Sequence, residues 1–251
     1  MIKKIIYDYN NAISDIYRSE SLSSLESNNF TYKDINILTC PQNPNYQEKK
    51  FNHFINQWDL INCCNDLMYF TSQLFLHQNL INNPFEEFTE FGNGKVLSLY
   101  HQNLYDHRYS IFVTCCFEKC YNYWDRIGDR LASFYPKLLK IHQVDFSRII
   151  DGINSLGVEN ENFRWLLNFK NNEYQQLNNH RKNLVHYCQY EANYRYEHVM
   201  HCADIEYLKP LWKEKSEFPE YFKNHLELAV EGYYHMYKFL ESLNQEKRDY
   251  N

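Results

Sequence analysis

Glycine and proline are scarce in this chain, which has six of each among its 251 residues. β-Sandwiches and doubly wound sheets need both residue types in their many turns, so the scarcity favours long helices. Aromatic side chains are abundant, with 23 Tyr and 17 Phe, and hydrophobic residues make up 44 % of the chain. This share is typical of a folded protein with a sizeable core. We therefore expect an all-α fold.

The formal charge of the chain is −6, from 26 basic and 32 acidic residues. Proteins that hold nucleic acid through many phosphate contacts are usually basic, so any nucleic-acid role must depend on a local site. The eight cysteines include the pairs Cys63–Cys64 and Cys115–Cys116 inside helical patterns, where reduced thiols act as small hydrophobes. No apolar signal core or membrane-span pattern is found. We expect a cytoplasmic protein without a membrane partner.

Hydrophobic residues recur at helical spacing along most of the chain. We expect residues 1–50 to form an N-terminal helix and an irregular connection, with one extended piece near Asn36–Thr39. We expect residues 51–251 to form a helical bundle. Its first helices run from Phe51 to about Asn82 and from Leu104 to Phe134, on either side of a short hairpin or turn at residues 92–94.

The C-terminal part of the bundle begins with a short helix capped by Asp145 or Ser147. Residues 159–169 form either another short helix or the approach to the helix that runs from Glu173 to about Tyr190. An irregular stretch around Pro210 then precedes a last helix that begins at about Pro219. The total is about five or six helices, several of them long, with at most a minor hairpin.

The segment Asn179–Tyr187, with sequence NHRKNLVHY, holds the residues best suited to chemistry. It places Arg181 five positions before His186, with Asn183 between them. Arginine is a permanent cation whose planar fork fits phosphate oxygens, and histidine transfers protons near neutral pH. Metal-independent cleavage of RNA needs both groups. A base takes the proton of the attacking 2′-hydroxyl, a cation stabilises the phosphorane, and an acid protonates the leaving 5′-oxygen.

This pattern resembles the HEPN superfamily (higher eukaryotes and prokaryotes nucleotide-binding), all-helical domains marked by an arginine, four to six residues and a histidine. The helix around Tyr123–Asp129 also looks like segments of uncharacterised bacterial members, and the resemblance covers roughly residues 100–243. It implies a homodimeric helical bundle that acts as a metal-independent endoribonuclease, with Arg181, Asn183 and His186 at its site. Lys182 departs from the pattern, because a polar residue usually follows the arginine.

The resemblance further implies an RNA substrate, no cofactor and no metal. Many such domains act in toxin–antitoxin or antiviral defence systems, so an antitoxin or a nucleotidyltransferase is an implied partner. The alternative is a non-catalytic helical dimer that binds a nucleotide, RNA or a protein. On that interpretation Arg181 and Lys182 belong to a solvated helix face, and His186 is a histidine at the edge of the core.

Helical geometry and a second match both bear on the motif. Five residues at about 100° each put Arg181 and His186 about 140° apart around a helix axis, so they do not share one face. Either the long arginine side chain bends round toward the histidine, or a second subunit supplies the complementary half of the site. A second arginine–histidine pair, Arg195–His201, lies close to the irregular stretch. Only the first pair has a long helical pattern before and after it.

Two other groups of residues are less informative. The cysteines and histidines at positions 115–120 and 198–202 lack the paired spacing of a zinc site, so a metal-dependent enzyme is not favoured. The carboxylates Glu118, Asp125 and Asp129 are expected on the exposed face of the helix from Leu104, with Arg126 and Arg130 as ion-pair partners.

Overall fold

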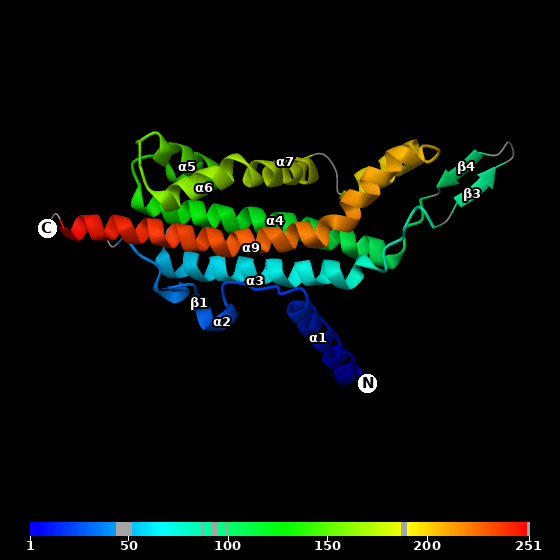
Figure 1. Ribbon diagram of the computed structural model, residues 1–251, viewed down its shortest axis with the longest axis horizontal. Helices are drawn as coiled ribbons and strands as arrows, with labels where there is room; N and C mark the ends of the chain where they lie inside the picture. Colours follow the sequence, from blue (N-terminus) through cyan, green and yellow to red (C-terminus); the bar gives the residue numbers. More distant parts are fainter. Residues whose placement is uncertain (44–51, 87, 92–94, 99, 187–189, 250–251) are drawn as a thin grey trace. The chain divides into compact units, whose positions relative to one another are not determined.

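The computed structural model describes residues 1–43, 52–86, 88–91, 95–98, 100–186 and 190–249. This part of the chain is mostly helical (Figure 1), which confirms the predicted all-α class. Its helices are α1 (Ile2–Ser19), α2 (Ser27–Phe30), α3 (His53–Gln78), α4 (Leu104–Phe134), α5 (Phe146–Asn154), α6 (Glu161–Asn171), α7 (Glu173–His186), α8 (Tyr190–Met200) and α9 (Ile205–Asp249). Its short elements are β1 (Thr31–Tyr32), β2 (Ile35–Asn36), η1 (Ile37–Thr39), β3 (Phe88–Phe91), β4 (Lys95–Ser98) and η3 (Ile141–Gln143). The described residues thus form more helices than the five or six predicted.

Two small antiparallel strand pairs lie between the helices. β3 pairs with β4, which confirms the predicted hairpin. β1 pairs with β2 around Lys33, whose φ of 51° lies in the left-handed region. The extended piece predicted near Asn36–Thr39 is wrong for most of its length, because Asn36 is the last residue of β2 and Ile37–Thr39 form the 3₁₀ turn η1.

Local capping explains where the short helices begin. Asp145 accepts a hydrogen bond on its side chain from the backbone N–H of Arg148, at 2.8 Å, and α5 starts at the next residue. This is one of the two caps predicted for this helix. Asn160 caps α6 in the same way, accepting from the backbone N–H of Asn162 and Phe163. Such side chains satisfy amide groups that lack a helical acceptor.

The last helix is longer than predicted. α9 contains Pro210 and Pro219, so the irregular stretch predicted around Pro210 is wrong. Pro210 is the sixth residue of the helix, so it removes the amide donor that would otherwise bond to the backbone oxygen of Glu206. Around Pro219 the buried side chains of Phe218 and Phe222 keep one face of the helix in the core. Tertiary packing therefore outweighs the local preference of proline.

The described chain divides into two compact units, each made of three segments. Unit 1 comprises Met1–Leu22, Tyr69–Phe117 and His180–Asn224. Unit 2 comprises Ser23–Met68, Glu118–Asn179 and His225–Asn251. Helices α3, α4, α7 and α9 each contribute residues to both units. The boundary at residue 50, expected from the sequence, stays a prediction.

The core of unit 2 forms around the indole of Trp124 on α4. Its ring stacks on Phe169 of α6, with 4.0 Å between ring centroids, and lies 4.9 Å from the ring of Phe146. On α9 a glycine, Gly232, leaves room for this indole. The hydroxyl of Tyr123 donates to the backbone oxygen of Ala229 at 2.7 Å, which joins α4 to α9.

One expectation for α4 is wrong. Asp129 and Arg130, expected on the exposed face, are only 2 % and 3 % exposed. Arg130 donates to the side-chain oxygen of Gln57 on α3 at 2.9 Å, and Asp129 accepts from Arg126 at 3.0 Å. The predicted ion pair between Arg126 and a neighbouring carboxylate is therefore present. It lies partly in the interior because α3 covers this side of α4.

Candidate functional site

All three residues of the predicted motif belong to one helix, α7. Earlier in this helix Tyr174 and Leu177 are buried. Arg181, four residues after Leu177, is partly buried, and Asn183 is exposed. His186 is the last residue of α7, and its side chain lies outside the described part of the structure.

The helical register separates the two described side chains of the motif. Arg181 follows Tyr174 by seven residues and Leu177 by four, so it continues their inward-facing row. Asn183 lies about 200° from Arg181 around the axis, on the solvent side. The structure thus brings the motif onto one helix but does not bring Arg181 and Asn183 onto one face.

The residue just before the motif contacts an aromatic cluster in unit 1. The imidazole of His180 stacks on Phe117 of α4, with ring centroids 5.6 Å apart and an angle of 18° between the rings. The ring of Tyr221 on α9 lies 6.2 Å from the same imidazole. Sequence reasoning gave His180 no role. Its partners are distant in sequence, so no local pattern could have identified the contact.

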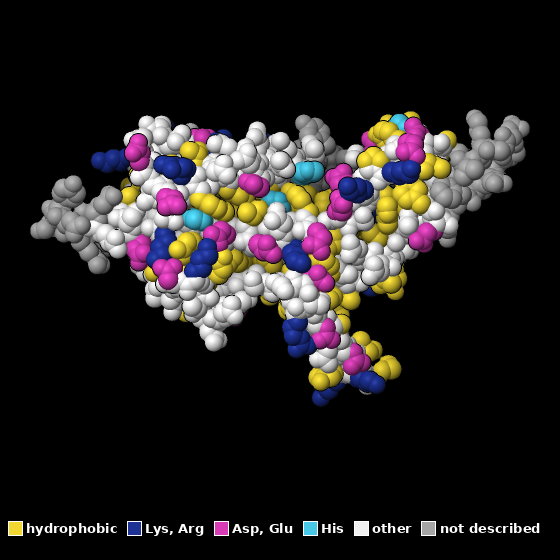
Figure 2. Space-filling view, in the orientation of Figure 1, with side chains coloured by type: hydrophobic (Ala, Val, Ile, Leu, Met, Phe, Trp, Pro, Cys, Tyr) yellow, Lys and Arg dark blue, Asp and Glu magenta, His cyan; other side chains and the backbone are white. Residues whose placement is uncertain are grey.

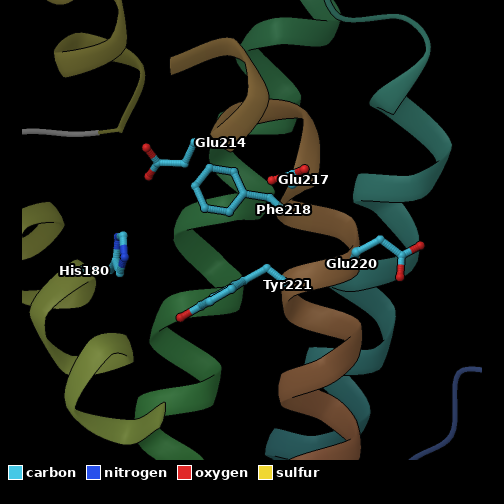
Figure 3. A pocket seen from close by; sticks show the side chains of 6 residues that line it. All are labelled: His180, Glu214, Glu217, Phe218, Glu220 and Tyr221. Atoms are coloured by element: carbon cyan, nitrogen blue, oxygen red, sulfur yellow. The ribbon is translucent and has the colours of Figure 1, made fainter. Parts of the chain in front are cut away.

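His180 also lines a cavity of about 500 Å³, a size typical of small-ligand sites. In Figure 3, Phe218 and Tyr221 extend from α9 toward His180 on α7. The remaining lining residues are carboxylates of α9, namely Glu214, Glu217 and Glu220. The cavity therefore has aromatic walls and an acidic rim, and all six residues belong to unit 1.

The charge of this rim decides which ligands fit. Glu217 lies 3.8 Å from the ammonium of Lys213, and Glu220 lies at the same distance from Lys223. Contacts this long between side chains near the surface neutralise little charge. Within the described part of the chain, neither a lysine nor an arginine lines the cavity. Its potential favours cationic groups and disfavours a phosphodiester.

A buried charged network lies on another side of α9. Lys215 is 1 % exposed, and its ammonium donates to the carboxylate of Asp106 at 2.9 Å. A second carboxylate, that of Glu191, lies 3.7 Å from the ammonium, and the ring of Tyr194 lies 4.3 Å away. This network joins α4, α8 and α9 within unit 1.

Glu191 in this network is held by two hydroxyl donors, Tyr100 and Ser110. Burial, reinforced by the bond to Glu191, raises the pKa of the Tyr100 phenol far above its ordinary value. Tyr100 therefore stays a donor throughout the physiological range. The network is fully satisfied on its carboxylate side, which indicates a structural role.

The histidines near Cys202 have separate partners. His198 is buried, and its Nε2 lies 3.1 Å from the backbone oxygen of Ser98. Burial lowers the pKa of His198 below its ordinary value. His201 stacks on Tyr207, with ring centroids 3.7 Å apart. Within the described residues, no group of three or more His, Cys, Asp or Glu side chains has the arrangement of a metal site.

No family model matches the chain, and comparisons with curated proteins and with solved structures found no significant match. The resemblance to HEPN domains therefore depends on the residues of α7 and stays a prediction. Among the described helices, none combines the length and the apolar character that crossing a membrane requires.

Proposed function

We propose that this protein is a metal-independent endoribonuclease of the HEPN type, active as a homodimer. The observation that carries the proposal is that Arg181, Asn183 and His186 fall together in the C-terminal half of α7, in an all-helical chain. Arg181 is partly buried, so its charge is less screened by water than that of a fully exposed arginine.

In this proposal each motif residue has a defined task. His186 takes the proton of a ribose 2′-hydroxyl as its oxygen attacks the adjacent phosphorus. Arg181 stabilises the added negative charge of the phosphorane. The bond from phosphorus to the 5′-oxygen then breaks, and the imidazolium of His186 returns the proton to this oxygen. The products are a 2′,3′-cyclic phosphate and a 5′-hydroxyl, and Asn183 orients the RNA.

The register of α7 supports the homodimer in this proposal. Arg181 and Asn183 face different directions, so one helix alone cannot present both to the same phosphate. A second α7, related by a two-fold axis, supplies the missing group from the opposite side of the RNA. A role in a toxin–antitoxin or defence system belongs to the same proposal.

The test is cleavage of structured RNA by the purified protein in EDTA. We expect Arg181→Ala and His186→Ala each to lower the cleavage rate by about 10²-fold or more. Arg195→Ala and His201→Ala are matched controls, because they remove the same residue types from the other arginine–histidine pair. Those two variants should cleave at the wild-type rate.

Two results of this assay would contradict the proposal. Cleavage lost equally in the Arg195 and Arg181 variants would show that the motif is not specific. Activity that disappears in EDTA would show that the protein uses a metal ion.

A second candidate, a helical module that binds a protein without chemistry, is favoured by the acidic rim of the cavity. The described residues that line it include three glutamates and neither lysine nor arginine, which suits a basic protein segment and not RNA. This candidate would be favoured over the ribonuclease if the wild-type protein neither cleaved nor bound RNA but bound a basic protein segment through this cavity.

A further inference from the structure

Helix α1 exposes an apolar face over its first turns (Figure 2). Ile2, Ile5, Ile6 and Tyr9 recur at helical spacing and are between 37 % and 70 % exposed. The same row continues to Ile13, which is buried in the chain's own core. Contiguous exposed apolar patches of this kind mark interaction sites. One end of α1 is thus packed, and the other presents a row of apolar side chains to solvent.

The exposed turns of α1 are basic. Lys3 and Lys4 are both exposed, and the first acidic residue along the helix is Asp8. The cavity between His180 and α9 has the opposite character, with aromatic walls and the carboxylates of Glu214 and Glu217 at its rim. One chain therefore carries a basic apolar segment and an acidic apolar cavity. The two are complementary in both charge and polarity.

We propose that the first turns of α1 from one copy of the chain dock in this cavity of a second copy, while the second copy returns the same contact. The isoleucines of α1 lie against the rings of Phe218 and Tyr221 that line the cavity, and the lysines lie beside the glutamates of the rim. Such an exchange is two-fold symmetric and closes on itself, so it produces dimers and not filaments. Both halves of the contact belong to unit 1.

Docking in the cavity of a second copy is favoured over docking in the chain's own cavity, because the C-terminal part of α1 is already held by contacts within the chain. The hydroxyl groups of Tyr9 and Tyr69 are 2.7 Å apart, and Ile13 is buried. At the end of the helix Lys223 lies 3.6 Å from Glu20 and 3.8 Å from Glu220. Folding the first turns back onto the same chain would break this packing, whereas docking in a second copy preserves it.

Charge reversal on each side of the contact tests the proposal, with mass measured by light scattering after size exclusion. The wild type is expected to be a dimer. Lys3→Glu/Lys4→Glu places like charges at the contact, and so does Glu214→Lys/Glu217→Lys. Each variant alone should associate at least about tenfold more weakly than the wild type. Lys137→Glu/Lys140→Glu, a charge change of equal size at exposed positions of unit 2, should remain a dimer.

Mixing the two variants is the decisive step. In the mixed pair an acidic α1 meets a basic cavity, and a basic α1 meets an acidic cavity, so both contacts become favourable. Mixing should therefore restore dimers, each containing one chain of each variant. Circular dichroism of each variant checks that the helices are intact.

Three outcomes would overturn the docking. The wild type could remain a monomer, the variants could dimerise alone, or mixing could fail to restore the dimer. If the α1 variant lost the dimer and the cavity variant kept it, the apolar face of α1 would instead pair with α1 of a second copy. The inference does not rest on RNA cleavage. A dimer that does not cleave overturns only the ribonuclease, whereas a monomer that cleaves overturns the docking and also the requirement that the ribonuclease be a homodimer.

Discussion

At the scale of single residues, burial decides what a charge does in this protein. Lys215 lies within a segment of alternating lysines and glutamates, a pattern that indicates a solvated helix face. It is nevertheless enclosed in unit 1 with Asp106 and Glu191. A buried ammonium of this kind is retained only because carboxylates surround it.

Replacing Lys215 should therefore destabilise the protein strongly. Lys215→Met keeps the length of the side chain but leaves two carboxylates buried without their counter-charge. We expect the free energy of unfolding in urea to fall by about 3–5 kcal/mol. Lys209→Met, on the same helix but at an exposed ion pair with Glu206, should change it by less than about 1 kcal/mol. Equal effects of the two variants would contradict the structural role of the network.

His53 in unit 2 gives a prediction about pH. Burial, followed by the charge of Arg130, lowers the pKa of His53 from 6.5 to about 4. The unfolded chain therefore binds more protons than the folded chain between these values. Stability from this group is fully present above pH 6.5 and is lost as the pH falls toward 4.

The measurement is the urea midpoint of unfolding between pH 7 and pH 4. The wild type should lose stability over this range more steeply than His53→Asn, which accepts from Arg130 without titrating. His142→Asn, at an exposed position of unit 2, is the control and should follow the wild type. If the urea midpoints of the wild type and His53→Asn fell equally with pH, the lowered pKa of His53 would be contradicted.

The sequence identifies the chemistry-bearing residues of α7 but not their surroundings. Arg181, Asn183 and His186 share a local pattern, so composition and spacing find them. His180 and Lys215 depend on partners far away in the chain, Phe117 and Asp106. A local pattern contains no information about such partners, and neither the cavity nor the network could be predicted.

At the scale of elements, close packing of helices limits which residues can face each other. A Cβ added to Gly232 on α9 would overlap the indole of Trp124, so this glycine permits the contact between α9 and α4. Gly152 on α5 is different, because the nearest atom to an added Cβ is a side-chain carbon of Leu138 at 3.4 Å.

The two glycines should therefore respond in opposite directions to alanine. Gly232→Ala is expected to lower the free energy of unfolding by about 1–3 kcal/mol through overpacking. Gly152→Ala should raise it by about 0.5–1 kcal/mol, because alanine is the better helix former and has room. Thermal unfolding followed by circular dichroism measures both. Stabilisation by both variants would show that α9 and α4 are packed less closely.

Hydrophobic periodicity predicts most elements correctly, and its failure has a physical cause. The predicted helices correspond to α1, α3 and α4, and the predicted cap Asp145 begins α5. The prediction fails at Pro210, where a local rule for proline was applied to a helix held by Phe218 and Phe222. Local rules place helix ends well only where tertiary contacts are few.

At the scale of the whole molecule, net charge constrains the proposed reaction. The chain has a formal net charge of −6, and the cavity beside α7 has an acidic rim. A ribonuclease with this charge contacts few phosphates. We expect the logarithm of kcat/KM for RNA to fall with the logarithm of salt concentration with a slope between about −1 and −3.

Cleavage rates measured at RNA concentrations below KM, over a series of salt concentrations, give this slope. A much steeper dependence would mean that an extended basic surface holds the RNA, which contradicts a local site at Arg181. The Arg181→Lys variant is the control, because it keeps the charge and should keep the slope while it lowers the rate.

The division into two units is the feature furthest from the sequence. Each unit collects three separate segments, and the divisions cross α3, α4, α7 and α9 at residues with no change in helical pattern. In a sequence, boundaries between units are recognised by loops rich in glycine, proline or serine, and glycine and proline are scarce in this chain. A boundary that falls inside a long helix shared by two units has no such sequence pattern.

The enclosure of Trp124 has an optical consequence. Its indole is 1 % exposed and lies against Phe169, whereas the indole of Trp58, in the same unit, is 39 % exposed. An indole shielded from water emits at shorter wavelength and is protected from acrylamide, while one in contact with water emits further to the red and is quenched. With Trp165 and Trp212 replaced by phenylalanine, fluorescence from the two remaining tryptophans therefore distinguishes the interior of unit 2 from its surface as the protein unfolds.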